Sequence, residues 1–195
     1  MLAQFGPRKH YILVNEFDKR RQTGLKSLMF RPAADTRESR PITQSRFGGS
    51  EVDTIIVNSS REILRHIDKE TVMVGIDEAQ FLDSKLIEVV AILRGRLTVA
   101  IAGLDRDFRG LPFGPIGGLL AMADEVHRLT ALCSYCKTNP ASFSQRLTRG
   151  KPSSAFETEV IPEGESDSVI YEPRCAGCFE PPPDLGRWLN SRLRP

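Results

Sequence analysis

The sequence predicts an α/β protein, in which helices flank an open and mainly parallel sheet and a small cysteine-bearing domain follows. Two observations predict this fold class. Short apolar runs alternate with helical patterns through about the first 130 residues, and four cysteines then stand in two Cys-x-x-Cys pairs. Because parallel strands need long crossover connections, the alternation favours right-handed strand-helix-strand units.

The expected strands are apolar runs that are too continuous for half-exposed strands, so we predict buried parallel strands. They cover residues 25–30, 54–57, 71–76 and 97–102. Helical patterns predict helices over residues 11–22, over residues 61–69 with Ser59 or Ser60 as the cap, and after a capping Asp83. The helix after Asp83 would bury Leu86, Val89, Val90 and Leu93. Residues 37–51 are rich in Arg, Ser and Gly and have no useful period, so we expect a mobile loop there.

The composition is that of a globular protein, with 40% hydrophobic and 27% charged residues. It gives no reason to expect a membrane span, and a net charge of +2 gives none to expect nucleic acid, which needs basic residues concentrated on one face. The first thirty residues show no secretory signal, which predicts a cytoplasmic location. In that reducing compartment, paired cysteines are more often metal ligands or redox groups than disulfides.

The two cysteine pairs each have the spacing of a tight turn that directs two thiolates toward one cation. They are Cys133 with Cys136, and Cys175 with Cys178. Two such turns complete a tetrahedral zinc site, and because all four positions are then filled by protein, the ion would be structural. The alternatives are a redox pair and reduced cysteines that only fill space. Residues 137–174, which separate the pairs, exceed the roughly 15–20 residues of a compact zinc ribbon, so we expect ligand contacts among them.

A pair of carboxylates follows one of the predicted strands. Residues 72–76 lead into Asp77 and Glu78, and ligands bind at the carboxyl edge of open parallel sheets. An apolar strand that ends in Asp resembles the magnesium-binding strand of P-loop nucleoside triphosphatases. Alternation along the strand would direct the two side chains to opposite sides, so that one could serve a metal and the other accept a proton. In the alternative interpretation, Asp77 and Glu78 only cap the next turn.

Four segments together resemble the type II thymidine kinases, the zinc-containing cytosolic family. They are Gly-Ile-Asp-Glu-Ala-Gln-Phe at 75–81, Gly-Leu-Asp-Arg-Asp-Phe-Arg-Gly-Leu-Pro-Phe-Gly at 103–114, Leu-Thr-Ala-Leu-Cys-Ser-Tyr-Cys at 129–136 and Tyr-Glu-Pro-Arg-Cys-Ala-Gly-Cys at 171–178. The likeness extends from about Leu25 to Cys178 and is highly specific. It implies ATP-dependent phosphorylation of thymidine to thymidine monophosphate, with Mg²⁺ and a structural Zn²⁺, in a homo-oligomer that is commonly a tetramer.

The resemblance also implies roles for individual residues. Glu78 would be the general base for the nucleoside 5′-hydroxyl, and Asp77 would hold Mg²⁺. The other residues expected near ATP are Gly6, Lys9, Asp35, Thr36, Arg37, Ala79 and Gln80. Those expected at thymidine are Leu104, Phe108, Phe113, Val160, Ile161 and Tyr171, with Phe81 as a further contributor. Tyr171 matches the tyrosine of the family's lasso, a loop that the zinc site would clamp at both ends.

The amino terminus departs from the family, whose members carry Gly-Pro-Met-x-x-Gly-Lys-Ser/Thr as a phosphate-binding loop. This chain has Phe5-Gly-Pro-Arg-Lys-His-Tyr11, with Lys9 at the lysine position and no Ser or Thr after it. So few residues cannot wrap successive backbone N–H groups around phosphates. Three explanations stay open: a natural non-catalytic relative, a damaged or misread gene segment, and a short loop completed by Arg8 and Lys9. The alternative function is therefore a catalytically impaired nucleoside-binding relative, and a zinc-ribbon nucleic-acid binder is a weaker third.

The sequence predicts three divisions of the chain. Residues 1–132 would form the α/β nucleotide-binding core, residues 133–180 the zinc-binding lasso domain, and residues 181–195 a peripheral tail. Trp188 lies in this tail, outside the matched segments, and the sequence assigns it no function.

Overall fold

We describe the protein from a computed structural model, which covers residues 13–15, 17, 19–20, 22–35, 42–44, 51–158 and 168–194. The chain divides into two compact units. The first comprises residues 1–105 and 113–129, and the second comprises residues 106–112 and 130–195. Each unit is described by itself.

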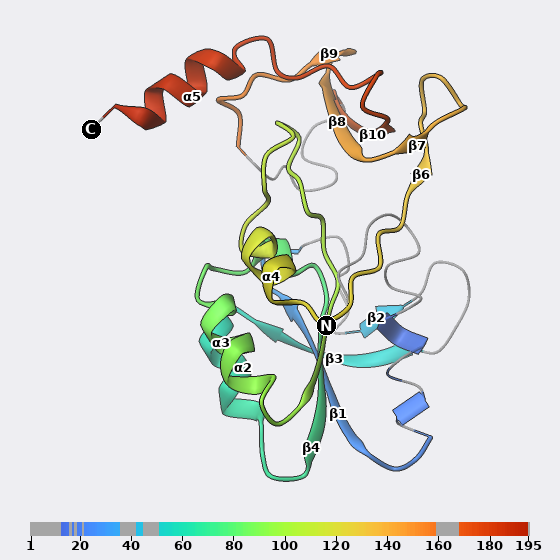
Figure 1. The fold of residues 1–195 in the computed structure, drawn as a ribbon, viewed down its shortest axis with the longest axis vertical. Coiled ribbons are helices and arrows are strands. Elements are labelled where there is room, and N and C mark those ends of the chain that lie inside the picture. Colours follow the sequence, from blue (N-terminus) through green and yellow to red (C-terminus); the bar gives the residue numbers. More distant parts are fainter. Residues whose placement is uncertain are drawn as a thin grey trace. The chain divides into compact units, whose positions relative to one another are not determined.

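The first unit is built on a five-stranded sheet with the strand order β2-β3-β1-β4-β5 (Figure 1). The strands are β1 (Lys26–Pro32), β2 (Ile42–Gln44), β3 (Glu51–Val57), β4 (Thr71–Ile76) and β5 (Thr98–Ile101). β1 pairs in parallel with β3 and β4, and β4 pairs in parallel with β5. The prediction of four parallel strands in an α/β fold is confirmed, and β4 has the predicted bounds. The prediction that all four are buried is wrong for β3, whose exposure alternates and leaves Ile56 40% exposed.

One strand lies where the sequence analysis expected a loop. Ile42–Gln44 forms β2, which pairs antiparallel with the start of β3, so that Ile42 faces Asp53 and Gln44 faces Glu51. The loop prediction is therefore wrong at 42–44 and at Glu51. The polar composition concealed a strand because β2 is short and its backbone is satisfied by the strand that follows it. The rest of 37–51 lies outside the described residues.

Helices cover both faces of the sheet, as the buried side chains show. On one face, α2 (Ser60–His66) and α3 (Leu86–Leu93) pack on a cluster that includes Val74 and Ile76 (Figure 1). On the other face, helical residues Leu13, Val14 and Phe17 pack with Met29 and Met73. The predicted first helix is thus confirmed at 13–15, 17 and 19–20, whereas Gln22, its predicted last residue, lies in a turn. α3 buries the four residues that its pattern predicted, and α2 follows Ser59 as expected but ends at His66.

A glycine permits the close approach of Phe17 to β4. A Cβ atom at Gly75 would lie 2.6 Å from Cε2 of Phe17 and 2.7 Å from Sδ of Met29. These distances are far below van der Waals contact, so any larger residue would push the first helix away from the sheet.

Asp83 joins the starts of two helices. Its carboxylate accepts the backbone N–H of Ser60 at 2.9 Å and that of Lys85 at 3.0 Å, and its carbonyl accepts the N–H of Leu86 at 3.1 Å. The N-cap of α3 is Lys85, two residues after the predicted cap. Burial opposes ionisation of Asp83, but these N–H groups outweigh it and lower the pKa of the carboxyl. Asp83 therefore stabilises α2 as well as α3.

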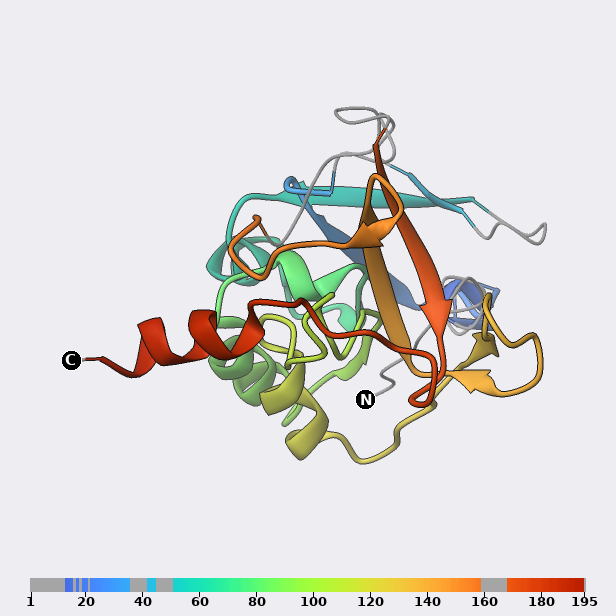
Figure 2. The same cartoon turned by 90° about the horizontal axis from the view of Figure 1, so that it is seen from above.

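The second unit consists of short strands, as predicted, and ends in a helix that was not predicted. A three-stranded antiparallel sheet has the order β10-β8-β9, and β8 and β10 run side by side in Figure 2. Its strands are β8 (Phe143–Thr148), β9 (Lys151–Pro152) and β10 (Val169–Arg174), beside a hairpin of β6 (Ala131–Leu132) and β7 (Pro140–Ala141). The helix α5 spans Leu185–Leu193 and has no buried residue.

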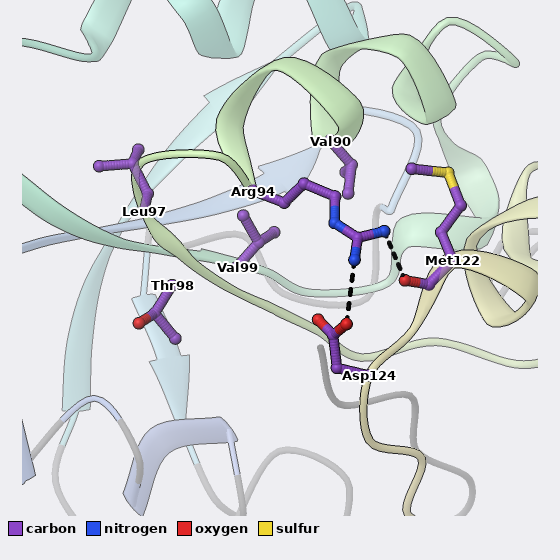
Figure 3. A pocket seen from close by; sticks show the side chains of 7 residues that line it. All are labelled: Val90, Arg94, Leu97, Thr98, Val99, Met122 and Asp124. Carbon is purple, nitrogen blue, oxygen red and sulfur yellow. Dashed lines mark hydrogen bonds and ion pairs between the residues drawn. The ribbon is translucent and has the colours of Figure 1, made fainter.

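A small cavity of the first unit lies at the amino end of its edge strand β5 (Figure 3). It has a volume of about 240 Å³ and is lined by Val90, Arg94, Leu97, Thr98, Val99, Met122 and Asp124. Arg94 donates hydrogen bonds to the Asp124 carboxylate and to the Met122 carbonyl, both at 2.9 Å. The guanidinium thus ties the end of α3 to the chain that follows α4 (Ile116–Met122), which is a structural role.

Among the described residues, no helix is both long and apolar enough to cross a membrane.

We expect Asp83→Ala to lower the free energy of unfolding by about 1 kcal/mol, because two helix starts lose the acceptor of their N–H groups. Urea denaturation monitored by circular dichroism measures the change. The matched control is Glu88→Ala, which removes an exposed carboxylate from α3 that pairs with Lys85, and it should change stability by less than about 0.5 kcal/mol. Equal effects of the two substitutions would contradict the assignment.

Candidate functional site

The four cysteines come together in the second unit on two turns. The β6–β7 hairpin holds the first, in which Cys133 donates its N–H to Asn139 O at 2.9 Å and Lys137 turns through a left-handed φ of 56°. The second follows β10, with the N–H of Cys178 bonded to Cys175 O at 3.0 Å. Ser134 N–H donates to Pro173 O at 2.8 Å and joins the two turns.

The sulfur atoms have the separations of a tetrahedral metal site. All four lie within 4.8 Å of one another, and Cys136 Sγ lies 3.9 Å from Cys175 Sγ. A zinc ion with Zn–S bonds of about 2.3 Å separates its ligands by about 3.8 Å. All four cysteines are free, and 3.9 Å is far longer than a disulfide bond of about 2.05 Å. The cluster can bind zinc, and a shared point for four sulfurs favours this over a redox pair or space-filling thiols.

The electrostatics of the cluster favour a cation. Burial disfavours the Cys133 thiolate, but backbone N–H groups of Cys136, Cys175 and Tyr135 lower its pKa to about 6. The pKa of Cys178 is raised to about 12, first by its hydrogen bond with the Cys175 thiol and then by burial. Four neighbouring thiolates repel one another unless a metal ion neutralises them, so metal binding would release protons.

In the first unit, buried carboxylates lie at the carboxyl end of β4, the strand between β1 and β5. Asp77 and Glu78 are 1% and 0% exposed. The backbone N–H of Asp77 bonds to Phe30 O of β1 at 2.9 Å, and that of Ala79 bonds to Ala102 O after β5 at 3.0 Å. The turn is thus fixed to both neighbouring strands.

Glu78 adopts a left-handed backbone conformation, with φ 49° and ψ 39°. This conformation costs a residue with a side chain roughly 1 kcal/mol or more. β4 ends at Ile76, so the turn, and not strand alternation, sets the directions of Asp77 and Glu78. The argument from alternation therefore does not apply to these two side chains.

Gln80 connects the Glu78 carboxylate to the next strand end. Its amide N–H₂ donates to Glu78 Oε2 at 2.6 Å, and its carbonyl Oε1 accepts Leu104 N–H at 3.1 Å. Gln80 is 2% exposed. Gly114, with φ 51°, lies so close that a Cβ atom would be 2.3 Å from Gln80 O. The resemblance placed Gln80 near ATP, which stays a prediction, and its side chain joins the Glu78 carboxylate to the backbone of Leu104.

A further carboxylate lies at the end of the neighbouring strand β1. Asp35 is 9% exposed, and its Oδ2 lies 3.9 Å from Arg31 Nε, whose residue is 3% exposed. Because β1 and β4 are parallel neighbours, Asp35, Asp77 and Glu78 all follow strands at the same edge. Thr36, Arg37, Gly6 and Lys9 lie outside the described residues.

The residues expected at thymidine belong to both units. In the first, Phe113 packs edge-on against Phe81 with ring centroids 5.5 Å apart, and Leu104 is bonded to Gln80. In the second, Phe108 is 3% exposed, and the guanidinium groups of Arg109 and Arg146 lie 4.4 and 4.2 Å from its ring centroid. Tyr171 is 47% exposed. Val160 and Ile161 lie outside the described residues.

Arg146 lies next to both Phe108 and Tyr171, the two residues of the second unit that are expected at thymidine. It pairs with Tyr171 across the β8–β10 ladder, and directly opposite residues of an antiparallel pair present their side chains on the same face. Arg146 and Arg109 are 1% and 5% exposed, and the sequence analysis named neither as a site residue. Arg109 lies within residues 103–114, one of the segments that resemble the family, but a sequence does not distinguish a buried arginine from a solvated one.

The features of the two units are typical of one class of protein, an α/β fold with buried carboxylates at the carboxyl edge of a parallel sheet and four clustered cysteines that could hold a metal ion. The family model described as thymidine kinase matches residues 6–179. The chain belongs to the thymidine kinase family, which confirms the resemblance seen in the sequence.

We expect the purified protein to hold about one zinc ion per chain, because the cluster has a single set of four sulfurs. Cys175→Ser should remove most of the zinc and lower the melting temperature. The matched control is Ser134→Ala, which changes a side chain next to a ligand and should leave the zinc content unchanged. Atomic emission spectroscopy and thermal denaturation measure both, and full zinc content in Cys175→Ser would contradict the site.

Proposed function

We propose that the protein is a thymidine kinase that transfers the γ-phosphoryl group of ATP to the 5′-hydroxyl of thymidine. Family membership indicates a kinase. The observation that carries the finer proposal is the buried Asp77–Glu78 turn, because phosphoryl transfer to a hydroxyl needs a positioned carboxylate beside a metal-binding one.

Glu78 serves in this proposal as the general base. The hydrogen bond from Gln80 at 2.6 Å and the left-handed backbone restrict its carboxylate to one direction. A base that is already oriented loses little entropy when the substrate hydroxyl arrives. In transfer, the proton of the 5′-hydroxyl passes to a Glu78 oxygen while the hydroxyl oxygen attacks the γ-phosphorus and ADP leaves.

Asp77 and Asp35 are the groups that would bind magnesium. Carboxylate oxygens are the ligands this cation prefers, and both residues lie at the same sheet edge as Glu78. Bound with ATP, the ion would neutralise charge on the phosphate oxygens. Asp77 Oδ1 accepts the Glu78 N–H at 2.9 Å, so the residue that would hold the metal also fixes the backbone of the base.

The nucleoside would be bound by apolar and aromatic side chains. We assign this role to Leu104, Phe108, Phe113 and Tyr171, because flat bases pack well against such groups. A structural zinc ion would stabilise the turn from which β10 and Tyr171 extend. A homotetramer, which the family resemblance implies, is part of this proposal.

A second candidate function is nucleoside binding without turnover. One observation favours it: residues 5–11 contain too few positions for the family's phosphate-binding loop, and no hydroxyl residue follows Lys9. These residues lie outside the described part of the chain. The two candidates share the nucleoside site and differ in phosphoryl transfer.

The test of the proposal is Glu78→Gln in an assay with ATP, Mg²⁺ and labelled thymidine. We expect kcat to fall by about 10²–10⁴-fold because the base is lost, while the thymidine Kd changes little. The matched control is Glu88→Gln, which alters an exposed glutamate of α3 and should keep wild-type kcat.

Calorimetry on the wild-type protein separates the outcomes. Thymidine binding without product formation would overturn the kinase proposal in favour of the second candidate. Absence of both binding and turnover would overturn both.

Gln80→Glu should raise the pH at which activity appears. A second carboxylate beside Glu78 in a buried site raises the pKa of the pair, so the acid limb of the kcat–pH profile moves to higher pH. Gln80→Leu, which removes the hydrogen bond without adding charge, should instead lower kcat by up to about 100-fold through misorientation of the base. An unshifted profile in Gln80→Glu would show that Gln80 does not act on the base.

A further inference from the structure

The helix α5 lies outside the residues that the family model matches, yet its N-cap Asp184 and its residue Trp188 connect it to a turn of the second unit. The turn comprises residues 153–158, which follow β9. Asp184, the N-cap of α5, accepts the Ser154 hydroxyl at 2.6 Å and the Ala155 N–H at 2.8 Å. A helix without buried residues is thus fixed to the body of its unit by a charged acceptor.

Trp188 reaches the same turn through Arg109. The guanidinium lies 4.6 Å from the Trp188 ring centroid and donates hydrogen bonds to Ala155 O and Glu157 O, both at 2.9 Å. Asp107 accepts a further bond from it at 2.8 Å. The Asp184 carboxylate therefore accepts hydrogen bonds from the turn, and Arg109 donates hydrogen bonds to the carbonyls of the turn. Asp184 caps α5, and Trp188 of α5 packs on Arg109.

The contacts continue to the proposed nucleoside-binding residues. Arg109 also lies over the Phe108 ring, whose centroid is 4.2 Å from the Arg146 guanidinium. Arg146 bonds to Thr158 O at 2.6 Å and to the Glu157 carboxylate, which are both in the 153–158 turn. Ring contacts thus join Trp188 to Arg109, Arg109 to Phe108 and Phe108 to Arg146, and Tyr171 is the residue that pairs with Arg146 across the β8–β10 ladder.

We propose that α5 is a positioning element for nucleoside binding, in which Asp184 and Trp188 hold the 153–158 turn and the Arg109–Phe108–Arg146 stack. This inference rests on the proposed function, because it takes Phe108 and Tyr171 as thymidine contacts. A buried guanidinium needs acceptors for its N–H groups and favourable packing on its faces, and the Trp188 ring packs on Arg109. Without it, one face of the Arg109 guanidinium loses its cover, and the hydrogen bonds to Ala155, Glu157 and Asp107 alone hold the group over the Phe108 ring.

The test compares Trp188→Ala with Trp188→Phe in the full-length, zinc-containing protein. We expect Trp188→Ala to raise the thymidine Kd by about 3- to 30-fold, as the loss of a cation–π contact predicts, with the ATP KM unchanged. Trp188→Phe keeps an aromatic face and should return the Kd to within about 3-fold of wild type. Asp184→Ala should weaken thymidine binding in the same way, with partial rescue by Asp184→Asn.

The control Asn190→Ala alters an exposed residue of the same helix and should change neither constant. Hydrogen exchange of the peptide that covers the 153–158 turn gives a readout that does not need thymidine, and exchange should be faster in Trp188→Ala than in wild type. A wild-type thymidine Kd or unchanged exchange in Trp188→Ala would overturn the positioning role. If the wild-type protein binds no thymidine while exchange still rises in Trp188→Ala, the proposed function fails and α5 only stabilises the turn.

Discussion

The break at the end of β4 is the constraint on which the proposed catalytic geometry depends. β4 lies between β1 and β5, so its backbone is paired on both sides up to Ile76. The backbone N–H groups of Asp77 and Ala79 then bond to a carbonyl of β1 and to the carbonyl that follows β5. Glu78, which lies between these two fixed residues, adopts the left-handed conformation. The conformational cost is offset by bonds that the sheet makes in any case, and the result is a buried carboxylate with one orientation. A flexible loop at the same place would give the base no fixed direction.

The two units are stabilised by different physical means. Both apolar clusters found among the described residues consist of first-unit side chains. In the second unit the buried residues include Arg109, Arg146, Gln145, Ser153 and Arg174, together with two of the four cysteines. A unit of this size buries little apolar surface, and hydrogen-bonded guanidinium groups add stability, as a metal ion at the cysteine cluster would. The arginines are therefore part of the fold, because truncating one would leave buried carbonyls and carboxylates without donors.

The sequence predicted features that depend on local pattern and spacing, and it missed those that depend on distant partners. β4, the four buried positions of α3 and the cysteine cluster each follow from periodicity or from a repeated pair. β2 was missed because three polar-flanked residues become a strand only when β3 is beside them. The bond between Gln80 and Glu78 requires the left-handed turn, which Glu disfavours and which the sheet imposes. Trp188 had no interpretation because its partner Arg109 is far away along the chain.

The two candidate functions differ in how well the chain stabilises the phosphates of ATP, and the general base does not distinguish between them. A general base contributes about 10²–10⁴-fold to a rate. Each donor that stabilises developing charge on a transferring group is worth about 10²–10³-fold, and a phosphate loop supplies several. In the second candidate function, a chain that keeps Glu78 in place but has only residues 5–11 for this loop would lose more from the second effect than it retains from the first. Turnover therefore requires that the charges of Arg8 and Lys9 replace the loop's N–H groups, whereas nucleoside binding makes no such demand.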